Sequence, residues 1–390
     1  MKTERRKCSF IIFRLMDTPN RNSYQKPLAI CTTCDTQILA VEREGKVSKV
    51  DQAANTVAFL SFGRKFWPIL FPLWTFYKIF RYQGLNGIIY TDWHSPSLFV
   101  GTICRLLGMI WIADIWDNPD KRMLNWLDSK RKPPFWKYLY HKIQSYLNYI
   151  YFKFPNKVVT SQPDVVKVFG VSDQKIVAHP NGVDLSKTVP DTSYQSIRSN
   201  IKLLYVGPIE RNRLRYLSDI LKNTYNRIGN FDICLIGKTD QSNFLDELKR
   251  SIPKEITYRV TGWIDHNEVL EHIRSSTVCL FPYPRTKEIN EIFPIKIFEY
   301  LAMNKVVVAS KTKVTQQIIT HKKNGFLYEA QDTEKVAAYI DEIVNDPCKK
   351  LMMEREAGKT ALEYSWEKII SDIMSQLEAY FSEKSDDGIY

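Results

Sequence analysis

The sequence feature that most constrains the fold is a repeated alternation of short apolar segments with helical patterns. In the first half, helical patterns over 95–107 and 135–152 lie among the apolar segments SFIIFRL, TQILAVE, TVAFLSF, GIIYT, MIWIADI and KVVTS. After residue 200 the rhythm restarts with IKLLYVG, DICLIG, ITYRVTG, STVCLFP and KVVVAS. Fully apolar strands separated by helices are typical of parallel sheets covered on both faces. Two such runs predict an α/β chain of two doubly wound domains.

The boundary between these domains is predicted in the polar segment SKTVPDTSYQSIRSN, which has the composition of a linker. A chain of 390 residues is also too long for one ordinary hydrophobic core. We therefore assign residues 1–190 to a first domain and 191–365 to a second. Residues 366–390 are expected to form a C-terminal helix that crosses back to the first domain, followed by a frayed tail.

Ligands of an open parallel sheet bind beyond the carboxyl ends of its strands, so the loops there are candidate binding sites. In the loop GPIERNR, Gly207 would let a backbone approach a ligand closely. Arg211, Arg213 and Arg215 follow it at a helix start, and guanidinium groups match phosphate oxygens in a fork. The cluster is either a phosphate clamp or a solvated basic turn. The sequence contains neither G-x-G-x-x-G nor a Walker P-loop, which disfavours dehydrogenases and P-loop NTPases.

The segment EINEIFPIKIFEYLA, residues 288–302, contains two carboxylates around a proline. Pro294 suits the opening of a helix, because the N–H that proline lacks would be unpaired there. Glu291 then lies in the preceding loop, and Glu299 lies inside the helix. The two side chains either share one binding site or are unrelated surface acids.

Seven segments in order resemble a known family, over roughly residues 155–380. They are KIVAHPNGVD, YVGPIERN, DICLIG, YRVTGWIDHNEV, STVCLFPYP, EINEIFPIKIFEYLAMNKVVVAS and NGFLYEAQD, and Trp366 precedes the last helix. In this order they resemble the retaining glycosyltransferases of the GT-B fold, the family that includes sucrose and glycogen synthases and bacterial mannosyltransferases. The resemblance implies two Rossmann-like domains that face a central cleft.

The resemblance also assigns roles to the two carboxylates. Glu291 matches a glutamate near the reacting face of the donor sugar, which makes it a catalytic candidate. Glu299 matches a glutamate that accepts hydrogen bonds from the nucleotide ribose. Pro294 and Ile295 then belong to a helix start near the sugar and diphosphate. A carboxylate can accept two hydroxyl donors, and helix N-terminal N–H groups favour an anion.

The phosphate-binding positions depart from the family pattern. Many members carry an arginine directly after the glycine of the VG turn and a lysine some six residues later, which together neutralise the leaving diphosphate. Pro208 and Leu214 hold those places here. Arg211 and Arg213 could substitute for them from shifted positions.

The first domain departs from the family as well. Members often have a histidine after the fifth strand, but the segment MIWIADIWDNPD contains none. Asp114 and Asp117 are therefore candidates for an acid that orients or deprotonates the acceptor hydroxyl. Each is otherwise a strand-end cap or turn aspartate. Trp93 and His94, one loop earlier, are further acceptor-side candidates.

The positive charge is concentrated in the first half. Residues 1–190 carry 27 Lys and Arg against 14 Asp and Glu, or +13, whereas residues 191–390 carry 28 against 29, or −1. Seven of the nine tryptophans precede residue 140. Basic and aromatic residues together indicate nucleic acid, an anionic membrane surface, or a basic surface without a partner. The stretches 63–81 and 130–154 favour the membrane interface, with Trp67, Trp74 and Trp136 as contacts.

Other sequence features indicate where in the cell the chain is located. The apolar run FWPILFPLWTFY is too short to span a bilayer, and the N-terminus lacks the small-residue cleavage site of a signal peptide. Seven cysteines in a chain of this length do not indicate a disulfide framework. We therefore expect a cytoplasmic protein, peripheral on the inner face of the cell membrane.

Together these features predict transfer of a hexose from a nucleotide sugar to a lipid-linked saccharide or lipid, in polysaccharide or glycoconjugate assembly. Retention of configuration is implied only by the resemblance, which also implies no metal or other cofactor. The alternative is a catalytically decayed scaffold of the same fold. Nucleic acid is not an expected partner, because no nucleic-acid-binding motif is recognisable.

Overall fold

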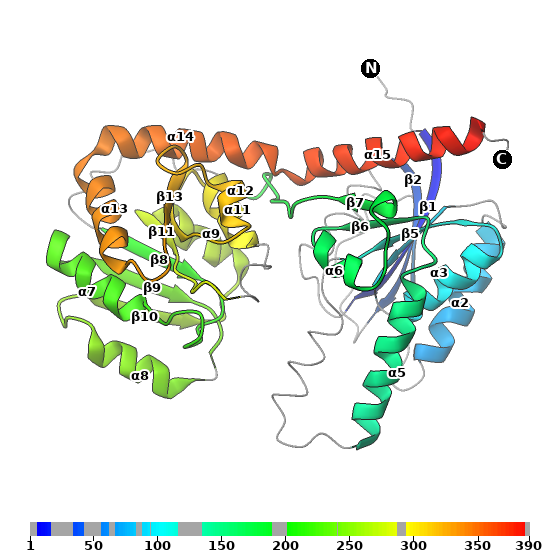
Figure 1. Ribbon diagram of the computed structural model, residues 1–390, viewed down its shortest axis with the longest axis horizontal. Coiled ribbons are helices and arrows are strands. Elements are labelled where there is room, and N and C mark those ends of the chain that lie inside the picture. The colour runs from blue at the N-terminus through cyan, green and yellow to red at the C-terminus, as the bar shows by residue number, and fades with distance from the viewer. Residues whose placement is uncertain are drawn as a thin grey trace. The chain divides into compact units, whose positions relative to one another are not determined.

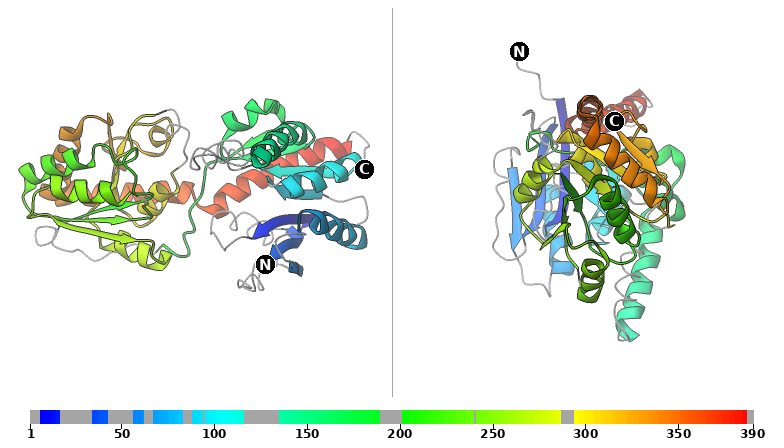
Figure 2. Two further views of the ribbon diagram at one scale, coloured as in Figure 1. Left: turned by 90° about the horizontal axis from the view of Figure 1, so that it is seen from below. Right: turned by 90° about the vertical axis from the view of Figure 1, so that its left-hand side faces the viewer.

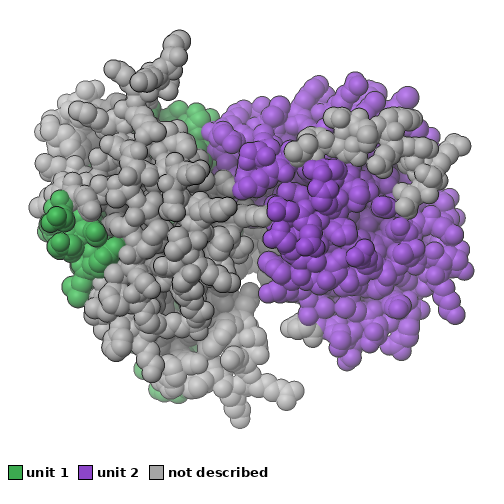
Figure 3. All heavy atoms as spheres, turned by 180° about the vertical axis from the view of Figure 1, so that it is seen from behind, with its two compact units in different colours: residues 1–180, 369–390 green, residues 181–368 purple. Residues whose placement is uncertain are grey.

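The computed structural model describes residues 6–16, 34–42, 56–61, 67–82, 88–93, 95–115, 135–188, 201–239, 241–286 and 294–386. The chain forms two compact units (Figures 1 and 3). One contains residues 1–180 and 369–390, and the other contains residues 181–368. Residues just after 180 group with the second unit because Val183 pairs with the segment before the last helix. Its N–H donates to the Tyr364 carbonyl at 2.9 Å, and its carbonyl accepts from the Trp366 N–H at 3.1 Å.

The first unit is built on a parallel sheet with the order β3-β2-β1-β4-β5-β6-β7. Its strands are β1 Arg6–Met16, β2 Cys34–Glu42, β3 Thr56–Ser61, β4 Ile88–Asp92, β5 Ile110–Asp114, β6 Lys157–Thr160 and β7 Ile176–Ala178. Each adjacent pair is parallel. The strand order reverses beside β1, as in a doubly wound sheet. The parallel α/β fold predicted for the first run of apolar segments is confirmed.

Helices connect these strands: α2 Trp67–Tyr82, α3 Ser95–Leu106, α5 Phe135–Tyr151 and α6 Pro163–Val168. The helical patterns over 95–107 and 135–152 are confirmed as α3 and α5. Helix α2 was not predicted, because its segment reads as an apolar run with two prolines. Pro68 lies in the first turn, where no N–H partner is needed, and Pro72 lies inside the helix.

Three of these helices cover the same face of the sheet. Helices α2, α3 and α5 connect β3 to β4, β4 to β5 and β5 to β6, so all three cross the sheet order in one direction. Right-handed crossovers place such helices on one face. Helix α3 contacts both α2 and α5. From residue 369 onward, α15 (Trp366–Asp386) belongs to this unit, where Tyr380 Oη accepts a hydrogen bond from Asn156 Nδ2 at 3.1 Å.

Two tryptophans to which the sequence analysis gave acceptor or membrane roles pack in or against the hydrophobic core of the first unit. Trp93 is 8% exposed and belongs to the hydrophobic cluster around the fully buried Trp111. Trp74 is half-buried and packs against the same cluster. The structure therefore makes Trp93 a core residue rather than an open acceptor contact, and much of Trp74 is occupied by packing within its own unit.

The second unit has a parallel sheet with the order β10-β9-β8-β11-β12-β13. Its strands are β8 Lys202–Val206, β9 Asp232–Ile236, β10 Thr257–Gly262, β11 Val278–Phe281, β12 Val306–Ser310 and β13 Gly325–Tyr328. Its helices are α7 Leu217–Ile228, α8 Ser242–Ser251, α9 His266–Ser275, α11 Ile295–Ala302, α12 Thr315–Ile318, α13 Thr333–Asn345 and α14 Pro347–Glu363. The second doubly wound run is thus confirmed.

Candidate active site

The carboxyl ends of three neighbouring strands in the second unit meet through glycines. The N–H of Gly207, after β8, donates to the Ile236 carbonyl at 2.9 Å, and the N–H of Gly237, after β9, donates to the Gly262 carbonyl at 3.0 Å. A Cβ on Gly237 would lie 1.8 Å from the Gly207 carbonyl oxygen. Only glycine allows the backbones to approach this closely. The strand ends therefore form one continuous backbone edge.

The candidate ribose ligand Glu299 lies on α11, beside this edge. Pro294 occupies the N-cap position and the helix begins at Ile295, as expected from the sequence. The Glu299 side chain is 10% exposed and both carboxylate oxygens are engaged. Oε1 lies 2.9 Å from His266 Nε2, at the start of α9, and Oε2 accepts from Lys296 Nζ at 2.8 Å. A buried carboxylate is thus held by polar groups from two helices.

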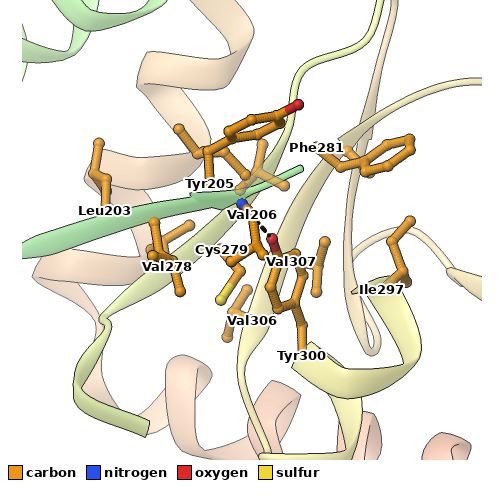
Figure 4. Packing of buried hydrophobic residues seen from close by; sticks show 14 of the residues in the cluster. Leu203, Tyr205, Val206, Val278, Cys279, Phe281, Ile297, Tyr300, Val306 and Val307 are labelled. Carbon is orange, nitrogen blue, oxygen red and sulfur yellow. Dashed lines mark hydrogen bonds between the residues drawn. The ribbon is translucent and has the colours of Figure 1, made fainter. Parts of the chain in front are cut away.

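Helix α11 is fixed to the sheet through its next residue. Tyr300 is fully buried, and its hydroxyl accepts a hydrogen bond from the Val206 N–H at 2.9 Å, at the end of β8 (Figure 4). Burial raises the pKa of the Tyr300 hydroxyl well above its ordinary value, so the group stays neutral. This bond ties α11 to β8, which gives Glu299 a rigid support.

Arg213 joins an aromatic network between the ends of β8 and β11. Its Nε donates to Glu210 Oε2 at 3.0 Å, and its Nη1 donates to the Tyr283 hydroxyl at 3.3 Å. The Tyr283 hydroxyl also lies 3.3 Å from that of Tyr205. A Cβ on Gly207 would lie 3.0 Å from the Tyr283 hydroxyl. Arg213 is therefore held close to the glycine turn at the end of β8.

Arg211 points to a different place. Its guanidinium pairs with Glu247 Oε2 at 2.5 Å and lies 5.2 Å from the centre of the Phe244 ring, both on α8. It lines a pocket at the start of that helix. The structure thus separates the two arginines that the sequence grouped in one phosphate clamp. Leu214, which holds the place of the family lysine, is a buried core residue.

The remaining candidates are only partly described. Asp114 ends β5, is buried, and pairs in register with Asp92 of β4. Glu291, Asp117 and His94 lie outside the described residues. Trp67 and Trp136 lie in α2 and α5, but their side chains are also outside the description. Within the described ranges, no group of three or more His, Cys, Asp or Glu could hold a metal ion.

Sequence reasoning missed three residues of this constellation. Lys296 lies three residues before Glu299, a spacing that places both side chains on the same helix face, so it could have been found. His266 lies in the segment YRVTGWIDHNEV, just beyond a predicted strand, and that position is the signal that could have found it. Tyr283 follows β11 without any motif of its own, and only the tertiary structure brings it to Arg213.

Comparison with known proteins shows a likeness to glycosyltransferases. Residues 200–346 match the family model described as glycosyl transferases group 1. An uncharacterized glycosyltransferase of Haemophilus influenzae is 23% identical over 158 residues, which span 40% of this chain and 43% of that protein. The chain spans about half the length of the curated relatives it matches.

Solved structures match along almost the whole chain. Anabaena HepE in complex with UDP and glucose is 14% identical with a TM-score of 0.67, covering 95% of this chain and 100% of that one. The lipopolysaccharide outer core galactosyltransferase WaaB is 12% identical with a TM-score of 0.60, covering 96% and 100%. Residues 200–346 thus resemble the glycosyl transferases group 1 family, and the two-sheet fold of the chain is that of the GT-B glycosyltransferases.

Proposed function

We propose that this chain transfers a hexose from a nucleoside diphosphate sugar to a lipid-linked saccharide or lipid. The observation that carries the proposal is the buried Glu299 carboxylate, held by His266 and Lys296 at the carboxyl edge of the second sheet. Such a carboxylate can accept hydrogen bonds from two neighbouring ribose hydroxyls. The binding mode requires these hydroxyls to replace or share its present partners.

The diphosphate is assigned to the cationic groups around the same edge. The first N–H groups of α11 carry the positive end of the helix dipole. Arg213 lies beside the glycine turn, and Lys296 lies in the first turn of α11. As the bond between the sugar anomeric carbon and the diphosphate oxygen breaks, negative charge grows on that oxygen. Fixed cations stabilise this charge without requiring a metal in the proposed mechanism.

The acceptor side of the proposal rests on the first unit. The acceptor hydroxyl oxygen forms the new bond to the anomeric carbon and loses its proton to a base. Asp114, at the end of a central strand, is our candidate for that base, and Glu291 is assigned to the donor sugar. The likeness to HepE with bound UDP and to the galactosyltransferase WaaB supports a sugar-nucleotide donor and a lipid-linked acceptor.

The proposal is tested by incubating the full chain with a panel of sugar nucleotides and a native lipid extract. Formation of nucleoside diphosphate and of glycosylated lipid from one donor, in the presence of EDTA, is the expected result. If no donor is consumed and no nucleotide raises the melting temperature, the decayed-scaffold alternative replaces it.

Replacing Arg213 with glutamine is expected to weaken nucleoside diphosphate binding roughly tenfold or more, because a charge-assisted phosphate contact is lost. Arg211→Gln is the matched control. Its guanidinium is paired with Glu247 on the exposed side of α8, so we expect binding to change by less than about threefold. Isothermal titration with the nucleoside diphosphate measures both constants. Equal losses would show that the two arginines act together, contrary to their separation in the structure.

A further inference from the structure

Three neighbouring helices over one face of the first sheet share an unusual charge pattern. Helices α2, α3 and α5 contain no aspartate or glutamate. They do contain basic residues, namely Lys78, Arg81, Arg105, Lys137 and Lys142. Helix α6, which the same connection rule places on this face, contains Asp164 and is not included. The neighbouring helices α2, α3 and α5 therefore form a cationic surface with no carboxylate of its own. We call it the three-helix face.

Helix α5 directs apolar side chains into solvent. Phe135 is 76% exposed and Tyr146 is 67% exposed. Each exposed apolar residue of this helix has another three or four positions away: Phe135, Tyr138, Leu139, Ile143, Tyr146, Leu147 and Tyr149. This period places them along one stripe of a helix. In Figure 1 and the right-hand view of Figure 2, α5 extends beyond the sheet of its own unit.

The neighbouring helices continue this composition. Helix α2 exposes Leu73, Tyr77 and Phe80, and α3 exposes Phe99 and Leu106. In the second unit, the exposed large apolar side chains among the described residues are Trp263, Leu351, Met352 and Leu362. Large exposed apolar patches on a protein indicate an interaction site. The exposed apolar residues of the first unit therefore indicate an interaction site on the three-helix face.

Cations lie against the aromatic rings of this face. Lys142 Nζ is 5.7 Å from the Tyr138 ring centre, and Lys153 Nζ, just after α5, is 4.1 Å from the Tyr149 ring centre. Lysines beside exposed aromatic rings match the headgroup zone of a bilayer, where rings insert and ammonium groups meet lipid phosphates. No helix in the described part of the chain is long and apolar enough to cross a membrane.

We propose that the three-helix face docks on an anionic lipid bilayer, with the apolar stripe of α5 in the headgroup layer. A second copy of the chain is a poorer occupant, because its three-helix face would bring the same positive charge and no carboxylates. A nucleic acid would satisfy the lysines and arginines but leave the apolar stripe in water. An anionic bilayer can neutralise the positive charge with its lipid phosphates and also bury the apolar side chains.

The docking is tested on the full chain without nucleotide, so its outcome does not depend on the proposed sugar transfer. Co-sedimentation is measured with phosphatidylcholine vesicles that contain or lack phosphatidylglycerol. We expect the chain to bind the anionic vesicles, and added salt to weaken the binding. The double variant Ile143→Glu/Tyr146→Glu should reduce partitioning at least about tenfold, because it adds two negative charges and removes the apolar contact.

The matched control is Leu351→Glu/Met352→Glu, which makes the same changes at exposed positions of α14 in the second unit. It should bind vesicles like the wild type, and both variants should keep the wild-type melting temperature. Equal binding by the α5 variant, or no preference for anionic vesicles, would overturn the proposal. So would sedimentation velocity showing a dimer that the α5 variant dissociates while vesicles are not bound.

Discussion

Replacing Glu299 with alanine is expected to lower kcat/KM for the sugar nucleotide by at least about a hundredfold. The substitution removes both oxygens that we assign to the ribose hydroxyls, and it releases His266 and Lys296 from their present contacts. Lys296 is one-third exposed and can turn to water, so the fold should survive the change. Steady-state kinetics with the donor that the sugar-nucleotide panel identifies, together with calorimetric nucleotide binding, measures the effect.

Two further variants make this result specific. Glu299→Gln keeps the shape of the side chain and one acceptor oxygen. Its kcat/KM should therefore lie between that of the wild type and that of Glu299→Ala. Glu271→Ala removes an exposed glutamate of α9 that pairs only with Arg274 among the described residues, and it should leave kinetics unchanged. If Glu299→Ala retains wild-type kcat/KM and nucleotide affinity, the ribose assignment is wrong and the donor binds elsewhere.

The strands and the donor helix could be predicted because their signals are local. Each apolar run is bounded by polar residues, and Pro294 marks the start of the segment that forms α11. Helix α2 could not be predicted in the same way. Two prolines argue against a helix locally, and only packing on the core of the first unit offsets the loss of hydrogen bonds at Pro72.

The parts of the site that sequence reasoning missed depend on contacts between distant segments. Arg211 and Arg213 are neighbours in sequence, but one pairs with α8 and the other with the loop after β11. Trp93 lies next to a predicted site loop, yet its ring is needed in the core. Sequence patterns report which residues could reach a strand end, whereas packing decides which of them remain available for a ligand.

Replacing Gly237 with alanine is expected to destabilise the second unit by about 3 kcal/mol or more. The new Cβ would lie 1.8 Å from the Gly207 carbonyl oxygen, and a backbone atom inside a sheet cannot move aside as a side-chain end can. The ends of β8 and β9 must separate to accept it. Thermal unfolding followed by circular dichroism should show a melting temperature lower by about 6 °C or more.

Gly262→Ala is the matched control for this clash. Gly262 ends the neighbouring strand β10 with φ of 71°, but no atom lies within 4 Å of the position its Cβ would take. Only the left-handed backbone conformation is then penalised, at about 1–2 kcal/mol. The larger loss at Gly237 should be accompanied by weaker nucleotide binding, because the shifted edge carries Gly207 and the adjacent Arg213 network. Equal losses for the two variants would mean that backbone conformation, rather than contact between strand ends, requires glycine at this edge.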